Sequence, residues 1–185
     1  MIGSPDLKVP LAAFLAESAG SVRHLEIEPT TIALDDDLVL GGPISGTLEL
    51  SRTNRGIFVR GDLRTSLSMD CSRCLGPAPV ELVAAIREEV LPAIDPASGL
   101  AVDPSTDADV MRLTAHHELD VESLMREAVS LSAPIAPLCR PDCPGLCPEC
   151  GARMADGHPA HDIDDIDPRL AALRGFQVDA DGKNE

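Results

Sequence analysis

The sequence has very few aromatic residues and almost no lysine. Tryptophan and tyrosine are absent and phenylalanine occurs three times, so any core must consist of aliphatic side chains and methionine. Only Lys8 and Lys183 are lysines, and the formal net charge at pH 7 is −16. These features argue against an aromatic platform for stacked bases and against long-range attraction to phosphates. The charge favours a basic protein as partner.

Long apolar segments and catalytic motifs are also missing. The first ten residues include Asp6 and Lys8 and lack the apolar segment of a signal peptide. No run approaches the roughly 18 apolar residues that a membrane helix needs. No nucleotide-binding glycine loop, esterase serine motif or metalloprotease motif occurs. We therefore expect a cytoplasmic protein without membrane contact, small-molecule substrate or enzymatic activity.

Cysteine and histidine, in contrast, form four close pairs. The pairs are Cys71 and Cys74, Cys139 and Cys143, Cys147 and Cys150, and His158 and His161. In a reducing compartment clustered cysteines bind metal more often than they form disulfides. Two pairs supply the four ligands of a tetrahedral zinc site, and such a closed shell serves structure rather than catalysis. The sequence therefore predicts two zinc ions.

The four pairs can be grouped in more than one way. We favour a first site that joins distant segments and a second site that is local. The first site would use Cys71, Cys74, Cys139 and Cys143, and the second Cys147, Cys150, His158 and His161. An alternative places the four C-terminal cysteines around one metal. A further alternative is that the two histidines are ordinary loop residues and not metal ligands, because His-x2-His is a short and common pattern.

Alternation of apolar and polar residues predicts antiparallel strands in the middle of the chain. They cover residues 22–28, 44–51, 57–69 and 80–90. A turn at 54–56 makes a hairpin, and the first C-x2-C lies at the tip of the next one, where Gly76 would relieve the tight turn. Residues 80–90 also fit a helix by their four-residue spacing, but a strand returning from the tip is favoured.

A helix is predicted over residues 120–132. Asp120 would cap it and Pro134 would end it, with Val121, Leu124, Met125, Ala128 and Leu131 as the apolar stripe. The fold class is therefore α+β: an antiparallel meander or barrel-like sheet with a packed helix. This domain would cover residues 1–138, with an apolar arm or short helix at 8–18 and a mobile insertion at 92–109.

The C-terminal part is too rich in proline and glycine to build its own apolar core, so a metal would have to organise it. We assign residues 139–175 to a zinc-knuckle module with a short helix at 168–173, and 176–185 to a frayed tail. One weak nucleic-acid signal remains. Arg60 and Arg64 would share the solvent face of the hairpin, and Arg73 lies at its tip.

Three landmarks occur in order along the chain. They are the Cys-Ser-Arg-Cys of residues 71–74, the helix that leads through Pro134 and Pro137 to Cys139, and the segment 143–151 followed by 167–173. Together they resemble the YceD family of large ribosomal RNA subunit accumulation proteins. Some members resemble this chain but carry cysteine at positions 158 and 161.

The resemblance implies a role in accumulating large-subunit ribosomal RNA in the bacterial cytoplasm. The expected partner is a large-subunit ribosomal protein or a pre-ribosomal particle, and direct binding of the 23S rRNA precursor is the alternative. No catalytic residue is carried over from the family.

Overall fold

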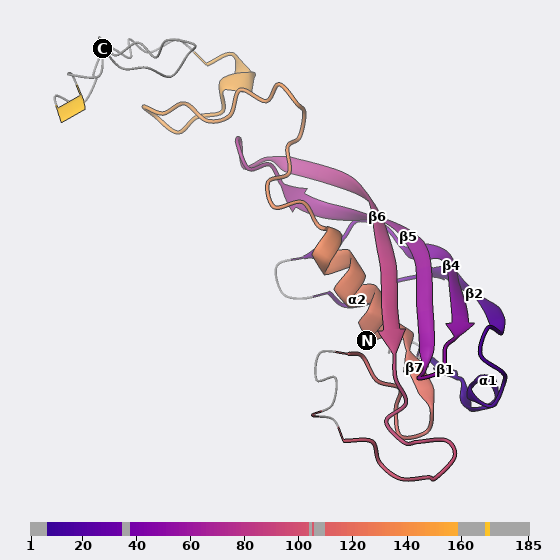
Figure 1. Ribbon diagram of the computed structural model, residues 1–185. Helices are drawn as coiled ribbons and strands as arrows, with labels where there is room; N and C mark the ends of the chain where they lie inside the picture. The colour runs from indigo at the N-terminus through magenta and orange to yellow at the C-terminus, as the bar shows by residue number, and fades with distance from the viewer. Residues whose placement is uncertain (1–6, 35–37, 104, 106–109, 159–168, 171–185) are drawn as a thin grey trace, which may run out of the picture.

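Alternation of apolar and polar side chains builds one open antiparallel sheet (Figure 1). The computed structural model describes residues 7–34, 38–103, 105, 110–158 and 169–170. The strands of this sheet are β2 (Val22–Thr30), β3 (Val39–Leu40), β4 (Ile44–Arg52), β5 (Ile57–Asp70) and β6 (Pro77–Val90). They confirm the predicted strands, and the strand interpretation of residues 80–90 is correct.

Strand β5 lies at the centre of the sheet and carries its longest hairpin. It pairs with β6 along its whole length, from Ile57 with Val90 to Asp70 with Pro77. Its other edge pairs first with β4 and then, further along, with β3. The end of the β5–β6 hairpin therefore projects past β4 toward the segment that follows α2 (Figure 1).

The two faces of the sheet differ as the alternation predicts. On β5, Ile57, Val59 and Leu63 are fully buried, whereas Arg60 and Arg64 are exposed. Helix α2 (Val121–Ser132) packs against β6 on the apolar face and completes the core. The opposite face carries polar and charged side chains, as expected for an antiparallel sheet with one solvated side.

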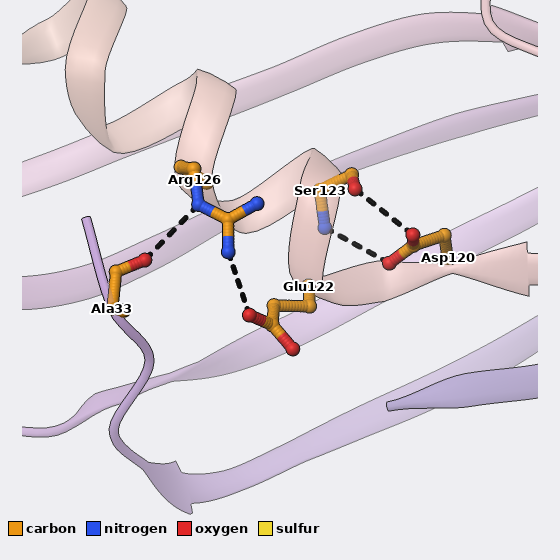
Figure 2. Close-up of polar contacts among 5 residues, drawn as sticks. All are labelled: Ala33, Asp120, Glu122, Ser123 and Arg126. Carbon is orange, nitrogen blue, oxygen red and sulfur yellow. Dashed lines mark hydrogen bonds and ion pairs between the residues drawn. The ribbon is translucent and has the colours of Figure 1, made fainter. Parts of the chain in front are cut away.

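Helix α2 begins where the sequence predicts. The Asp120 carboxylate accepts hydrogen bonds from the Ser123 backbone N–H at 3.0 Å and from the Ser123 hydroxyl at 2.9 Å (Figure 2). The helix ends at Ala133, whose extended backbone precedes Pro134. The prediction is wrong for one residue of the apolar stripe, because Leu131 is 78% exposed. Val129, which the predicted stripe did not include, is buried in the core.

Arg126 ties α2 to the segment between β2 and β3. Its Nε donates to the Ala33 carbonyl at 3.0 Å, and its guanidinium pairs with Glu122 one turn earlier at 2.6 Å (Figure 2). The helix is thus held by a polar contact on one side and by apolar packing on the other. Glu122 lies in the first turn of α2, where the positive end of the helix dipole favours a carboxylate.

The N-terminal segment forms a small second sheet instead of one helix. Strand β1 (Lys8–Pro10) pairs with β7 (Glu118–Asp120), and helix α1 (Ala12–Leu15) follows β1. Leu11 and Phe14 are fully buried. The expected helix or apolar arm at 8–18 is therefore divided between a strand and one helical turn, because residues 8–10 gain backbone partners from β7 that are distant in sequence.

The barrel-like closure suggested by the sequence is wrong. Within the described residues β2 pairs only with β4 and β6 only with β5, so these two strands do not pair with each other to close the sheet. Helix α2 covers the apolar face, so the sheet buries its side chains without closing on itself.

Several expectations fall in or near parts of the chain that are not described. In the expected insertion, Ile94 bridges Ala101, and Asp95 accepts hydrogen bonds from the backbone of Ala97 and Ser98. The mobility of 92–109 and the division into domains stay predictions. Most of the expected helix at 168–173 and the tail after it lie outside the described residues. In the described part of the chain neither α-helix has the length and apolar character needed to cross a lipid bilayer.

Candidate metal centre

Four cysteines from two distant segments meet at the tip of the β5–β6 hairpin. The sulfur atoms of Cys71, Cys74, Cys139 and Cys143 all lie within 4.8 Å of one another. Cys71, Cys74 and Cys143 are buried, and Cys139 is exposed. The structure therefore brings together the cysteines of the favoured first group. It does not form the alternative group of the four C-terminal cysteines.

The sulfur separations fit a tetrahedral zinc ion. The Cys71 and Cys143 Sγ atoms are 3.8 Å apart, as are those of Cys74 and Cys139. A tetrahedral zinc with bonds of about 2.3 Å separates its sulfur ligands by about 3.8 Å. A disulfide would need about 2.05 Å, and all six cysteines are free. This group could therefore hold one metal ion with four thiolate ligands.

The chain after α2 is fixed to the hairpin tip by backbone contacts as well as by cysteines. The Ser72 N–H donates to the Pro137 carbonyl at 2.8 Å. The Arg73 guanidinium donates to the Cys143 carbonyl at 3.0 Å. Leu138 packs on a small cluster formed by buried cysteines and Ala78, separate from the main core. These contacts position the second cysteine pair against the first.

The two C-x2-C segments have the same local structure. The N–H of the first cysteine donates to the carbonyl five residues later, from Cys71 to Gly76 at 2.7 Å and from Cys147 to Ala152 at 2.8 Å. The N–H four residues on then donates back to the first cysteine, from Leu75 and from Gly151, each at 2.9 Å. We call residues 71–76 and 147–152 the first and second cysteine turns.

The residue after the second cysteine has a left-handed backbone in both turns. Its φ is 55° at Leu75 and 70° at Gly151. The expectation that Gly76 relieves the first turn is therefore wrong, because Leu75 takes the strained position. Gly76 has another use. A side chain there would begin 3.3 Å from the Arg153 guanidinium, so the glycine leaves room for that group.

Arg153 joins the second cysteine turn to the first. Its Nε donates to the Cys74 carbonyl and its Nη2 to the Leu75 carbonyl, both at 3.1 Å. Arg73, in the first cysteine turn, instead contacts Cys143 of the first cysteine group. Sequence reasoning missed Arg153, because a single arginine in a turn-rich segment gives no local signal of a partner 79 positions earlier.

The electrostatics of the first group favour a bound cation. A hydrogen bond from the Cys139 backbone lowers the pKa of Cys71 to about 6, and the backbones of Arg73 and Cys74 act in the same direction. Hydrogen bonding with Cys143 raises the pKa of Cys139 to about 12. The first thiolate forms readily, but further ionisation places like charges together. A divalent cation removes that penalty and deprotonates its thiol ligands.

A second, less complete group lies in the C-terminal segment. Cys147, Cys150 and His158 have ligand atoms within 4.8 Å of one another. The backbone of Cys150, and next that of Glu149, hydrogen-bonds the Cys147 sulfur and lowers its pKa, although burial opposes this. The predicted fourth member, His161, lies outside the described residues.

The second group fits zinc less closely than the first. The Cys150 Sγ and His158 Nε2 atoms are 2.8 Å apart, which is a direct hydrogen bond. Ligands on one tetrahedral zinc would be about 3.6 Å apart, given bonds of about 2.3 Å to sulfur and 2.0–2.1 Å to nitrogen. Metal binding here would therefore require the Cys150–His158 pair to separate slightly.

The three arginines suggested as nucleic-acid contacts do not form one patch. Arg60 and Arg64 lie on the polar face of the sheet, where they line an open hollow of about 630 Å³ together with Arg87. Arg73 instead lies at the hairpin tip and bonds to Cys143. Arg60 is paired with Glu49 at 2.8 Å, and its guanidinium lowers the pKa of Glu49.

The fold and the site together define a class of protein. It is a small α+β protein in which an open sheet presents a cysteine-clustered hairpin tip, and a C-terminal segment with a second cluster is attached to that tip. The first candidate metal centre joins two segments of the chain that are distant in sequence.

Comparison with known proteins identifies the family. The sequence model described as large ribosomal RNA subunit accumulation protein YceD matches residues 59–177. Uncharacterized proteins of Mycobacterium bovis and Mycobacterium tuberculosis are 33% identical over 142 residues, which cover 77% of this chain and 64% of each of theirs. The chain belongs to the YceD family.

A plant relative carries the family description in its name. It is the chloroplastic large ribosomal RNA subunit accumulation protein YCED homolog 1 of Zea mays, 25% identical over 175 residues, covering 83% of this chain and 56% of the maize protein. The chain therefore spans about two thirds or less of the length of these relatives. No solved structure gives a significant match.

Proposed function

We propose that this chain is a non-enzymatic factor in the biogenesis of the large ribosomal subunit. The observation that carries this proposal is membership of the YceD family, because the family model and the maize relative are both named for accumulation of large-subunit ribosomal RNA. A net charge of −16 favours binding to a basic ribosomal protein or an assembly intermediate over binding to free RNA.

Zinc is the metal proposed for both cysteine-rich groups. Thiolate and imidazole ligands in tetrahedral sets are typical of zinc, and four protein ligands leave no position for water or substrate. The ion would fix the hairpin tip to the segment after α2 and would supply no catalytic chemistry. Elemental analysis of protein purified without chelator should give two zinc ions per chain. One ion would remove the second site, and iron would overturn the assignment.

Affinity purification from bacterial cells at moderate salt tests the proposed role. The tagged chain should recover large-subunit precursors or a large-subunit ribosomal protein, and depletion of the chain should lower the level of large-subunit rRNA. A matched purification with an unrelated acidic protein controls for charge. Recovery of neither kind of partner, with unchanged rRNA levels, would reject the role.

Direct RNA binding is a second candidate, and the hollow on the polar sheet face is the observation that favours it. Arg60, Arg64 and Arg87 all line this hollow, so three cations gather there despite the negative charge of the chain. Two of them have carboxylate partners, because Arg60 pairs with Glu49 and Arg87 with Asp62. Arg64 has no ion pair among the described residues. The local charge is therefore mixed, which ranks this candidate second.

A further inference from the structure

Strand β2 has one edge without a partner strand. Its inner edge pairs with β4, and among the described strands none pairs with the outer edge. A free strand edge presents backbone N–H and C=O groups that an extended peptide can use as an added strand. Pro29, near the end of β2, limits such pairing to the residues before it.

An apolar groove of about 390 Å³ lies beside this edge. Leu7 and Val9 line it from the β1 side and Leu25 from β2, and all three side chains are only half-buried. Val121, the first residue of α2, also lines the groove. A strand added at β2 would direct alternate side chains toward this apolar surface.

Two carboxylates flank the groove, and no lysine or arginine within the described parts of the chain lines it. Glu26 and Glu28 are exposed, and neither has an ion pair with any described residue. Two unpaired carboxylates beside a free strand edge complement lysine or arginine side chains. They also disfavour a second copy of this chain as the occupant, because two such edges would bring like charges together.

We propose that the groove and the outer edge of β2 bind an extended basic segment of a protein partner. Apolar side chains of the segment would enter the groove, and its cationic side chains would contact Glu26 and Glu28. The inference rests on the proposed function, for which it names the surface and the chemistry of the partner. Binding should weaken as the salt concentration rises, because salt screens exposed charge pairs.

The probe is a labelled nine-residue peptide of alternating valine and lysine with capped ends, titrated against the full chain by fluorescence anisotropy. Glu26→Lys combined with Glu28→Lys should weaken binding at least about tenfold, since two attractive pairs become repulsive. The matched control is Glu81→Lys with Glu88→Lys, two exposed glutamates on the opposite edge strand. The control should change binding less than about twofold if contacts at β2 dominate.

Two further measurements locate the contact. A peptide of alternating serine and lysine should bind at least about tenfold more weakly, because it cannot fill the apolar groove. Hydrogen exchange should slow in β2 when the valine peptide is bound. Equal effects of both double variants, equal binding of both peptides, or protection elsewhere would overturn the proposal. So would a dimer, seen by sedimentation, that the β2 double variant disrupts.

Purification from cells separates this proposal from the proposed function. If the unaltered chain recovers large-subunit precursors and the β2 double variant does not, both stand. If both proteins recover precursors equally, the groove proposal fails while the role survives. If the unaltered chain recovers none but binds the valine peptide at β2, the role fails and the groove remains a peptide site.

Discussion

Cys74 and Cys150 occupy equivalent places in the two cysteine turns but should differ in their contribution to stability. Cys74 is buried and meets Cys139 across 65 positions, whereas Cys150 is exposed and meets His158 eight residues later. Cys74→Ser should therefore lower Tm by about 4–12 °C and Cys150→Ser by less than about 3 °C. Thermal melts of zinc-loaded protein check this, with Ser72→Ala as control. Equal losses would contradict the unequal roles.

Leu75 is a second residue at which the structure makes a sharp prediction. Its φ of 55° is strained for a leucine, and its side chain is 63% exposed. Leu75→Gly should relieve about 1 kcal/mol of strain and lose about 0.5–1 kcal/mol to chain entropy, so Tm should change little.

Leu75→Ile is the matched variant, because a β-branched side chain tolerates a left-handed backbone less well. It should lower Tm by a few degrees in the same thermal melts, for a cost of about 1–2 kcal/mol. A glycine variant less stable than the isoleucine variant would show that the leucine side chain itself stabilises the turn.

At the residue scale the sequence predicts which residues are candidate metal ligands better than it predicts the backbone conformation and contacts around them. Pair spacing favours grouping Cys71 and Cys74 with Cys139 and Cys143, but it leaves the alternative group of the four C-terminal cysteines open. It gives no indication that Leu75 takes the left-handed position beside a glycine, or that Arg153 reaches the carbonyls of Cys74 and Leu75. The contact of Arg153 with Cys74 joins residues 79 positions apart, which local patterns do not encode.

The tip of the β5–β6 hairpin should depend on the metal, while the body of the hairpin should not. The tip belongs to a small cluster built from cysteines and Ala78, whereas residues such as Leu63 belong to the main core. Chelation should therefore speed hydrogen exchange in residues 71–76 and 137–143 and leave residues 57–67 protected. Readdition of zinc is the control. Loss of protection throughout the sheet would show that the metal supports the whole fold.

At the element scale, prediction succeeds for strands with one buried and one solvated face. The strong alternation in β4 and β5 fixes their faces and hence their register. It fails where an element depends on a distant partner. β1 requires β7, 110 residues later, and the open form of the sheet depends on the cover provided by α2. The pairing of β1 with β7 leaves no periodic signal in the sequence, and the apolar stripe that predicts α2 does not show whether the sheet closes.

The charge of the whole molecule and the local charge of its polar face point to different partners. The chain carries −16 overall, which repels phosphates at long range. The hollow lined by Arg60, Arg64 and Arg87 brings three positive charges together on this negatively charged chain. A test of RNA binding therefore has to distinguish direct contacts of these arginines from the effect of the net charge of the whole chain.

Arg60→Glu combined with Arg64→Glu makes that separation. If a basic protein is the partner, association with large-subunit precursors should persist, because the double variant makes the surface more negative and leaves Glu26 and Glu28 in place. If the chain binds RNA directly, the double variant should lose its association with large-subunit precursors. The unaltered chain should then bind naked large-subunit rRNA fragments tightly, and its affinity should fall steeply as the salt concentration rises.

Two further variants serve as controls for this test. Arg55→Glu with Arg169→Glu has the same charge change at two exposed residues outside the hollow and outside β2, and controls for the net charge. Arg64→Glu alone avoids breaking the Arg60–Glu49 pair and so controls for stability. Sucrose gradients with rRNA detection measure precursor association, and filter binding measures the naked RNA. Loss of both in the Arg60 and Arg64 variant, with the Arg55 and Arg169 variant unaffected, would establish the sheet face as an RNA contact and displace the basic-protein proposal.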